Sequence, residues 1–445
     1  MARIARVVRL SRSAVTVLRR HGPVTLAHNA LLWLRGKRGY FLRDLLMDIP
    51  DFRAIPENAD PSSQKLALCI SGVGLDAMRY RCAHLAEQLE LQGYGADVTT
   101  VEQARLPEAL TCYAVFVLHR VMAAPDYLAF VAEAQRRGKV VIFDTDDLVF
   151  DVSELDHVPG FQQFSHVERQ YVTDTIERNG RLLRACDAVT VSTDFLRDYI
   201  VSTGFHQRVA VVPNVVSVAM LQGADDALAA ANAHSTATSA SVASVASVAS
   251  VQGGDAPVTI GYFSGTKTHN LDILEAADSL LWALERYPQT RLQIVGHLWL
   301  DHRFERYAAR ITRVPLQPWQ RLPSLYSAID INLAPLERDN PFTEAKSCIK
   351  YLEAALCRVP TIASARSDFR RVISSGVTGL LADTPAEWQE ALARLIESPA
   401  ERQAMGQRAS DAVRARETTI AHAPATCAQL RSLAPAAFDS MTAQA

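Results

Sequence analysis

The sequence predicts an α/β protein with two Rossmann-like domains that face each other across a cleft, preceded by a basic helical extension. Short apolar runs alternate with amphipathic segments, this alternation occurs twice, and a low-complexity stretch separates the two occurrences. Strands that alternate with helices form parallel βαβ units. A chain of 445 residues is also long enough for two or three domains.

The composition is that of an ordinary globular protein, with 49% hydrophobic residues, 21% charged residues and a net charge of −2. It excludes a disordered or collagen-like chain and argues against nucleic acid as a partner of the whole surface. Seven cysteines without a C-x-x-C pair argue against a disulfide framework and a zinc site. We therefore expect a cytoplasmic protein without a bound metal, and no run of 18 apolar residues predicts a membrane span.

The first 43 residues carry ten lysines or arginines and no acidic residue. One helical face gathers the apolar side chains Ile4, Val7, Val8, Val15 and Leu18. A basic amphipathic helix of this kind can lie on an anionic membrane, and Trp33 suits that position. The alternative is a solvated helix packed on the body of the protein. We predict a helical extension over residues 1–64, with contact to the inner face of the membrane as an open possibility.

The predicted first domain covers residues 65–216. Apolar runs predict strands at 66–70, 97–101, 114–118, 140–143, 188–192 and 209–212. An amphipathic segment over 80–92 predicts a helix that ends at Gly93.

A biased segment over 217–256 separates the halves, and within it Ala-Ser-Val repeats four times. Such a composition is typical of a linker or a frayed helix. The predicted second domain covers residues 257–416, followed by a tail over 417–445. Its expected elements are strands at 259–263, 292–295, 329–333, 361–363 and 379–381, and helices at about 386–397 and 400–416.

Two motifs follow strands of the first half. Gly72 and Gly74 fit a G-x-G-x-x-A dinucleotide fingerprint, although a tight turn between a strand and a helix fits equally well. The run Asp144-Thr145-Asp146-Asp147 could hold Mg²⁺ or Mn²⁺ on a diphosphate. Its alternative is an acidic turn that caps a helix or binds a basic group.

The most specific motif runs from Asn340 to Ala355 in the second half, where a loop leads into a helix. Free N–H groups at the helix start, together with Lys346 or Lys350, would form an anion cradle. Glu353 could accept hydrogen bonds from a sugar diol, whereas the alternative is an ion pair between Lys350 and Glu353 on a surface helix. With the lysine of the upstream loop after Ser264, these groups suggest a diphosphate clamp.

These segments resemble the retaining glycosyltransferase family 4, also called glycosyl transferase group 1, whose members have the GT-B fold. The resemblance covers residues 65–216 loosely and 257–416 well. Its matching segments are Ser264-Gly265-Thr266-Lys267, Leu292–Gly296, Tyr326–Ile331 and the Lys350-Tyr351-Leu352-Glu353-Ala354 helix before Val359-Pro360, with Tyr80–Leu85 and Val211–Asn214 in the first half.

The resemblance implies metal-independent transfer of a hexosyl group from a nucleotide-sugar to a glycan or lipid-linked acceptor, with no further cofactor. It implies that Lys267 and Lys350 neutralise the diphosphate and that Glu353 holds the ribose. The family's glutamate pair is E-x7-E, but Ala345 stands eight residues before Glu353, and Glu344 stands nine before it. The remaining implied site residues are His119 at the cleft, Gly265, Thr266, Lys346 and Ser347 on the donor side, and Gly72, Gly74, Arg81 and Asp146 on the acceptor side.

The sequence therefore leaves three functions open. The first is a glycosyltransferase of polysaccharide or glycolipid biosynthesis. The second is an NAD-dependent Rossmann oxidoreductase, based on the glycine motif. The third is a catalytically silent subunit that binds a nucleotide-sugar, based on the altered glutamate pair.

Overall fold

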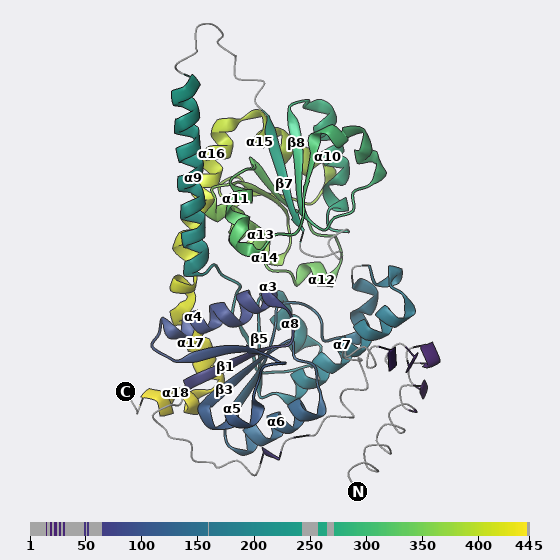
Figure 1. Ribbon diagram of the computed structural model, residues 1–445, viewed down its shortest axis with the longest axis vertical. Helices are drawn as coiled ribbons and strands as arrows, with labels where there is room; N and C mark the ends of the chain where they lie inside the picture. The colour runs from purple at the N-terminus through teal and green to yellow at the C-terminus, as the bar shows by residue number, and fades with distance from the viewer. Residues whose placement is uncertain are drawn as a thin grey trace. The chain divides into compact units, whose positions relative to one another are not determined.

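The computed structural model describes residues 65–158, 160–242, 257–264 and 271–442, with a few isolated positions before residue 53. Most of the predicted basic extension, the Ala-Ser-Val repeats after residue 242, and Gly265, Thr266 and Lys267 lie outside the described residues. The chain divides into two compact units (Figure 1). The first contains Met1–Val191, Arg197–Val211 and Ala428–Ala445, and the second contains Ser192–Leu196 and Val212–Cys427.

The first unit is built on a six-stranded parallel sheet in the order β2-β1-β3-β4-β5-β6. The strands are β1 (Lys65–Ser71), β2 (Ala96–Thr100), β3 (Tyr113–His119), β4 (Val140–Thr145), β5 (Ala188–Val191) and β6 (Val209–Val211). The helices are α3 (Leu75–Met78), α4 (His84–Glu90), α5 (Leu106–Cys112), α6 (Pro125–Arg136), α7 (His166–Ala185), α8 (Asp194–Ser202) and α18 (Pro435–Thr442). The central strands are buried and almost wholly apolar, as a parallel sheet covered on both faces requires.

The helix predicted over 80–92 is divided in the structure. A π-helical turn over Arg79–Ala83 joins α3 to α4, and Gly93 takes a positive φ of 83° just after the helix ends. A π-helical turn widens the backbone and re-aims the side chains that it carries. Here it carries Arg81, whose partners are described below.

The second unit is built on another six-stranded parallel sheet, in the order β12-β11-β10-β7-β8-β9. The strands are β7 (Val258–Ser264), β8 (Thr290–Gly296), β9 (Ile311–Val314), β10 (Ile331–Ala334), β11 (Thr361–Ser364) and β12 (Leu380–Ala382). The helices are α9 (Val218–Val242), α10 (Leu274–Arg286), α11 (Leu322–Tyr326), α12 (Pro341–Glu344), α13 (Ile349–Leu356), α14 (Ser367–Val372), α15 (Pro385–Glu397), α16 (Pro399–Arg416) and α17 (Thr419–Leu433).

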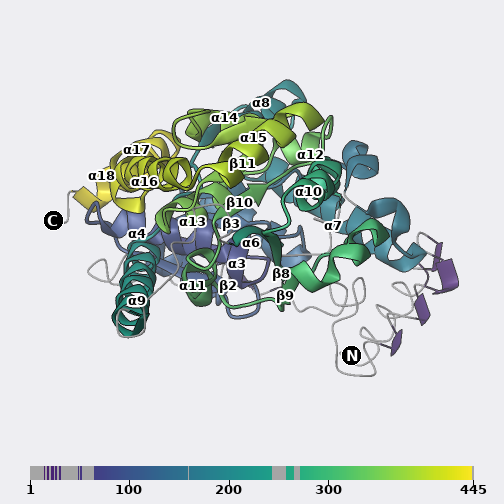
Figure 2. The ribbon, with the colours of Figure 1, turned by 90° about the horizontal axis from the view of Figure 1, so that it is seen from above.

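The core of the second unit lies between its sheet and the paired helices α10 and α15, which pack on each other (Figure 2). Trp388 of α15 is fully buried in this core beside strand residues such as Ile260 and Ile294. Figure 1 shows α10 and α13 on opposite faces of the sheet. The two parallel sheets with their helices confirm the predicted α/β fold class.

Three segments differ from the sequence-based expectation. Residues 218–242 of the predicted linker form α9, which packs on α11 and buries Met220 and Ala224. Alanine is the best helix former, so an alanine-rich composition that looks like a linker forms a helix here. Strand β9 was not predicted, and the predicted tail contains helices α17 and α18.

Among the helices of the described residues, none combines the length and the hydropathy needed to cross a bilayer.

The last helix belongs to the first unit although it ends the chain. Phe438 of α18 is fully buried, and its ring meets the Tyr94 ring edge-on, with centroids 5.0 Å apart. Arg431 donates to the Tyr94 hydroxyl at 2.6 Å, and Arg208 donates to the Leu433 carbonyl at 2.8 Å. The C-terminal segment thus completes the packing of the first unit.

Candidate functional site

The strand order of the second sheet reverses between β7 and β10. Open parallel sheets bind ligands outside the carboxyl ends of their strands at such a point. The loop after β7 falls in the undescribed residues 265–270. The loop after β10 and helices α12 and α13 are described, and they carry most of the donor-side residues that the sequence predicts.

Lys350 lies on α13 with its ammonium over the ring of Tyr262. Its Nζ atom is 4.5 Å from the ring centroid and 3.4 Å from the hydroxyl oxygen. Burial lowers the pKa of Lys350 to about 8, since it outweighs the opposing effects of Asp272 and Glu353, and Lys346 adds to the lowering. With this pKa, the partly desolvated ammonium of Lys350 is mostly charged at neutral pH.

Glu353 lies one helical turn beyond Lys350. Its Oε2 atom accepts a hydrogen bond from the Tyr326 hydroxyl at 3.3 Å. The Tyr326 ring in turn stacks on Phe263, with centroids 3.8 Å apart and planes 18° apart. The carboxylate is thus anchored through a tyrosine that the strand β7 supports.

One N–H group at the start of α13 already has a partner within the protein. The N–H of Cys348, the residue that precedes the helix, donates to Oδ2 of Asp368 at 2.7 Å. Ser347 accepts a hydrogen bond from the Asn214 side chain at 2.9 Å. The Asp368 carboxylate thus occupies one of the N–H groups at this helix terminus, and Lys346 and Lys350 are the positive groups of the segment.

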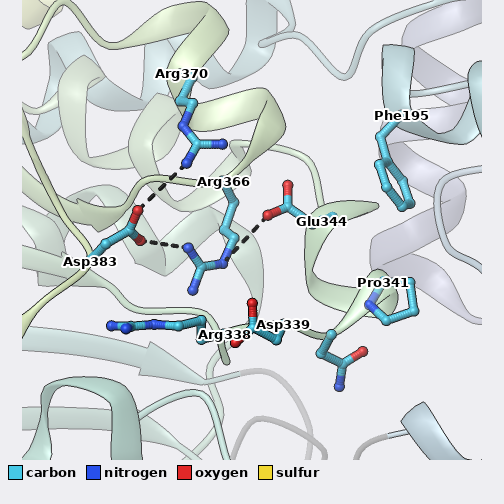
Figure 3. A pocket seen from close by; sticks show the side chains of 9 residues that line it. Phe195, Arg338, Asp339, Pro341, Glu344, Arg366, Arg370 and Asp383 are labelled. Carbon is cyan, nitrogen blue, oxygen red and sulfur yellow. Dashed lines mark hydrogen bonds and ion pairs between the residues drawn. The ribbon is translucent and has the colours of Figure 1, made fainter.

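A polar cavity of about 450 Å³ lies where β10, β11 and β12 end (Figure 3). Glu344 is the one lining residue that the sequence predicted. Nε of Arg366 lies 3.8 Å from Oε1 of Glu344, and Nη1 of Arg366 lies 2.5 Å from Oδ1 of Asp383. Arg370 also contacts Asp383, with its Nη2 atom 3.5 Å from Oδ2. No local motif marks Arg366, Arg370 or Asp383, because they follow later strands and meet Glu344 only through the sheet topology.

In the first unit, Arg81 and His119 converge on Asp144. Arg81 donates to both carboxylate oxygens at 3.0 and 2.6 Å, His119 Nδ1 lies 3.0 Å from Oδ1, and Thr190 donates to Oδ2 at 2.7 Å. Burial would raise the pKa of Asp144, but Arg81 and His119 together hold it well below its ordinary value.

The cluster around Asp144 lies in the interior of the first unit. Arg81 is 2% exposed and His119 is fully buried. Asp144 needs compensating partners because a buried carboxylate without them is very costly. Arg81 and His119 supply such partners here, and their predicted roles on the acceptor side and at the cleft stay predictions.

The acidic turn after β4 binds a basic group. Nη2 of Arg120 lies 2.7 Å from Oδ1 of Asp146 and 2.5 Å from Oδ2 of Asp147. Burial lowers the pKa of Arg120, but the two carboxylates more than compensate and raise it. This is the alternative that the sequence left beside a metal site, and it ties up Asp146 on the predicted acceptor side.

Gly72 and Gly74 differ sharply in their surroundings. A Cβ atom on Gly72 would lie 2.3 Å from the Arg120 carbonyl oxygen, whereas one on Gly74 would meet nothing within 4 Å. We expect Gly72→Ala to destabilise the protein by about 1–3 kcal/mol, because the backbone must shift to relieve the overlap. Gly74→Ala is the matched control and should stay within about 0.5 kcal/mol. Urea unfolding of both variants checks this, and equal midpoints would contradict it.

Comparisons with known proteins agree with this architecture. Residues 275–428 match a family model described as glycosyl transferase-like, whereas no curated protein matches the chain. HepE of Anabaena, solved with UDP and glucose, is 13% identical, with a TM-score of 0.54 over 83% of this chain and 100% of HepE. The chain has the GT-B fold.

Sucrose-phosphate synthase of Thermosynechococcus elongatus is 17% identical, with a TM-score of 0.53 over 84% of this chain and 100% of that enzyme. The trehalose 6-phosphate synthase of Burkholderia multivorans is 14% identical, with a TM-score of 0.51 over 85% of this chain and 98% of that enzyme. At these identities the likeness concerns the GT-B fold. It confirms the predicted architecture, and the family match falls on the unit that holds Lys350, Glu353 and the cavity.

Proposed function

We propose that this protein is a retaining, metal-independent glycosyltransferase of family 4. It transfers a hexosyl group from a nucleotide-sugar to a glycan or lipid-linked acceptor in polysaccharide or glycolipid biosynthesis. The observation that carries the proposal is the desolvated Lys350 ammonium beside Glu353, near the carboxyl end of a parallel sheet, inside the segment that matches the glycosyl transferase-like family.

The proposed chemistry follows from charge. Breaking the sugar–phosphate bond places negative charge on the leaving diphosphate, and fixed cations in a dry site stabilise that charge. Lys350 supplies one such cation, and Lys267 is proposed as the second. Glu353 accepts hydrogen bonds from the ribose diol, and Glu344 accepts one from the donor sugar. Metal independence is supported by Asp146 and Asp147, whose carboxylates hold Arg120.

The acceptor is proposed to bind the first unit near the turn of Gly72 and Gly74. The basic residues 1–43 would bring the enzyme to a lipid-linked acceptor, since clustered cations attract anionic lipid. We therefore propose a cytoplasmic enzyme that associates with the inner face of the membrane.

A panel of thermal shifts tests the function. The ligands are UDP, UDP-glucose, GDP, dTDP and NAD, each added with and without EDTA. UDP and UDP-glucose are tested first because HepE was solved with each of them. We expect one nucleoside diphosphate to raise the melting temperature and EDTA to leave that shift unchanged. Stabilisation by NAD alone would instead support an oxidoreductase, and loss of the shift in EDTA would contradict metal independence.

A silent nucleotide-sugar-binding subunit is the second candidate, because Glu344 stands one residue away from the family's glutamate position. Such a subunit would bind the sugar nucleotide without consuming it. Release of the nucleoside diphosphate from the stabilising sugar nucleotide, with or without acceptor, separates it from an enzyme.

The affinity for the nucleoside diphosphate should fall as the pH rises above about 8, because Lys350 has its pKa there and loses its charge. The loss is at most about tenfold per pH unit, since one proton is involved. In Lys350→Arg the guanidinium stays charged, so the decline between pH 7.5 and 9.5 should disappear. Calorimetric titration over this range checks both proteins, and identical pH profiles would rule out Lys350 as the titrating group.

A further inference from the structure

Arg366 forms the buried floor of the cavity (Figure 3). It is 3% exposed and immediately precedes α14. Its Nε atom donates to the Glu337 carbonyl at 3.3 Å, and its Nη2 atom donates to the Leu336 carbonyl at 3.3 Å. Nη1 donates to Asp383 at 2.5 Å. A buried guanidinium with partners on every nitrogen has one orientation, because leaving a donor unpaired in the interior is costly.

The loop between β10 and α12 is fixed by the same guanidinium and by other buried groups. Ser364 accepts from the Leu336 N–H at 2.9 Å, and Asp272 accepts from the Glu337 N–H at 3.3 Å. Asn340 caps α12 by accepting from the Phe342 N–H at 2.9 Å. Since α12 has only four residues and ends at Glu344, fixing the loop fixes the backbone from which the Glu344 side chain projects.

The side chain of Glu344 faces the same guanidinium. Its Oε1 atom lies 3.8 Å from Nε of Arg366, an ion-pair distance beyond hydrogen bonding. Glu344 and Asp383 are 30% and 32% exposed, whereas the cation behind them is 4% exposed. The cavity thus presents two carboxylates to a ligand, with the buried positive charge of Arg366 between them.

We infer that Arg366 is a positioning residue, which holds the Glu344 carboxylate toward the cavity as a hydrogen-bond acceptor for a hydroxyl of the donor sugar. The inference rests on the proposed function. It assigns Arg366 to recognition of the sugar, whereas Lys350 and Glu353 serve the nucleoside diphosphate. The two groups of residues should therefore respond differently to ligands with and without the sugar.

The test compares sugar nucleotides with the matching nucleoside diphosphates by titration calorimetry, using UDP-glucose and UDP, GDP-mannose and GDP, and dTDP-glucose and dTDP. The variants are Arg366→Gln, Glu344→Gln and the double variant. Arg408→Gln is the control, because Arg408 is exposed and donates only to the Val377 carbonyl among its described bonds.

For the pair that the wild-type protein binds, we expect each single variant to lose about tenfold in affinity for the sugar nucleotide, the size of one hydrogen bond to a charged group. Affinity for the nucleoside diphosphate should stay within about twofold. The double variant should lose no more than the single variants, because coupled residues are not additive. Arg408→Gln should match the wild type with both ligands.

Several outcomes would overturn the inference. Equal losses for both ligands, or losses that multiply in the double variant, would show a general structural role. Unchanged affinity for the sugar nucleotide would remove the role altogether. If Arg366→Gln does not fold, Arg366→Lys keeps the buried charge without the planar fork, and it should show a smaller loss confined to the sugar nucleotide. A folded wild-type protein that binds no ligand would defeat the proposed function itself, and this inference with it.

Discussion

Replacing Lys350 with alanine should lower the turnover of the sugar nucleotide by about 10²–10³-fold, the usual effect of removing one group that stabilises developing charge. The ammonium lies over the Tyr262 ring in a desolvated position, where water cannot replace it well. The free energy of unfolding should fall by only about 1–2 kcal/mol, because the lost contacts are a cation–π interaction and a long hydrogen bond with the same Tyr262 side chain. Initial rates of nucleoside diphosphate release measure the effect.

Lys139→Ala is the matched control for this experiment. Lys139 is also half-buried and has a pKa that burial lowers, but it lies in the first unit and donates to the Tyr113 carbonyl. It should retain nearly the wild-type rate. Lys267→Ala should also lose at least about tenfold if the second lysine shares the diphosphate. Near-native rates in both Lys350→Ala and Lys267→Ala would refute the proposed clamp.

Replacing Asp144 with alanine should destabilise the first unit by about 3–5 kcal/mol, because it leaves the buried Arg81 guanidinium without its carboxylate. Arg81 is 2% exposed and donates two hydrogen bonds to Asp144. Thr190 and His119 lose an acceptor in the same variant.

The measurement must resolve one unit from the other. Four of the five tryptophans, Trp282, Trp299, Trp319 and Trp388, belong to the second unit, so tryptophan fluorescence reports mainly on that unit. Hydrogen exchange of peptides from β3 and β4 does, and protection should fall there while β10 and β11 stay protected. Asp198→Ala is the control, since its pair with Arg197 in the first unit is exposed and such pairs contribute at most about 1 kcal/mol. Equal effects of both variants would contradict the expectation.

The sequence predicts the strands well where burial makes them uniformly apolar. Every predicted strand of the first sheet overlaps an observed one. Inner strands such as β1 and β3 are apolar along their length because both of their faces are covered, whereas the edge strand β2 is mostly half-buried. Strand β9 escapes this rule. Its sequence Ile-Thr-Arg-Val places two exposed polar residues in the middle of an edge strand, so it lacks the continuous apolar run on which the prediction depends.

The site is harder to predict than the fold. Lys350 and Glu353 share one helix, so their spacing alone shows that they lie close together. Arg366 and Asp383 lie near Glu344 only because β11 and β12 lie beside β10 in the sheet. The local sequence around each residue does not predict this proximity. The acidic residues at the end of β4 and just after it bind two different arginines. Asp144 turns inward to Arg81, whereas its neighbours Asp146 and Asp147 hold Arg120.

The path of the chain limits how this protein can be taken apart. The polypeptide passes from one unit to the other at four places, after Val191, Leu196, Val211 and Cys427. No single cut therefore frees an intact half, and a fragment that stops at residue 211 lacks the C-terminal residue Phe438 that lies against Tyr94. An exchange of acceptor specificity by grafting another first half would have to transplant residues 428–445 with it. Exchange of the first unit of this protein thus requires two junctions in the sequence, one near residue 211 and one near residue 428.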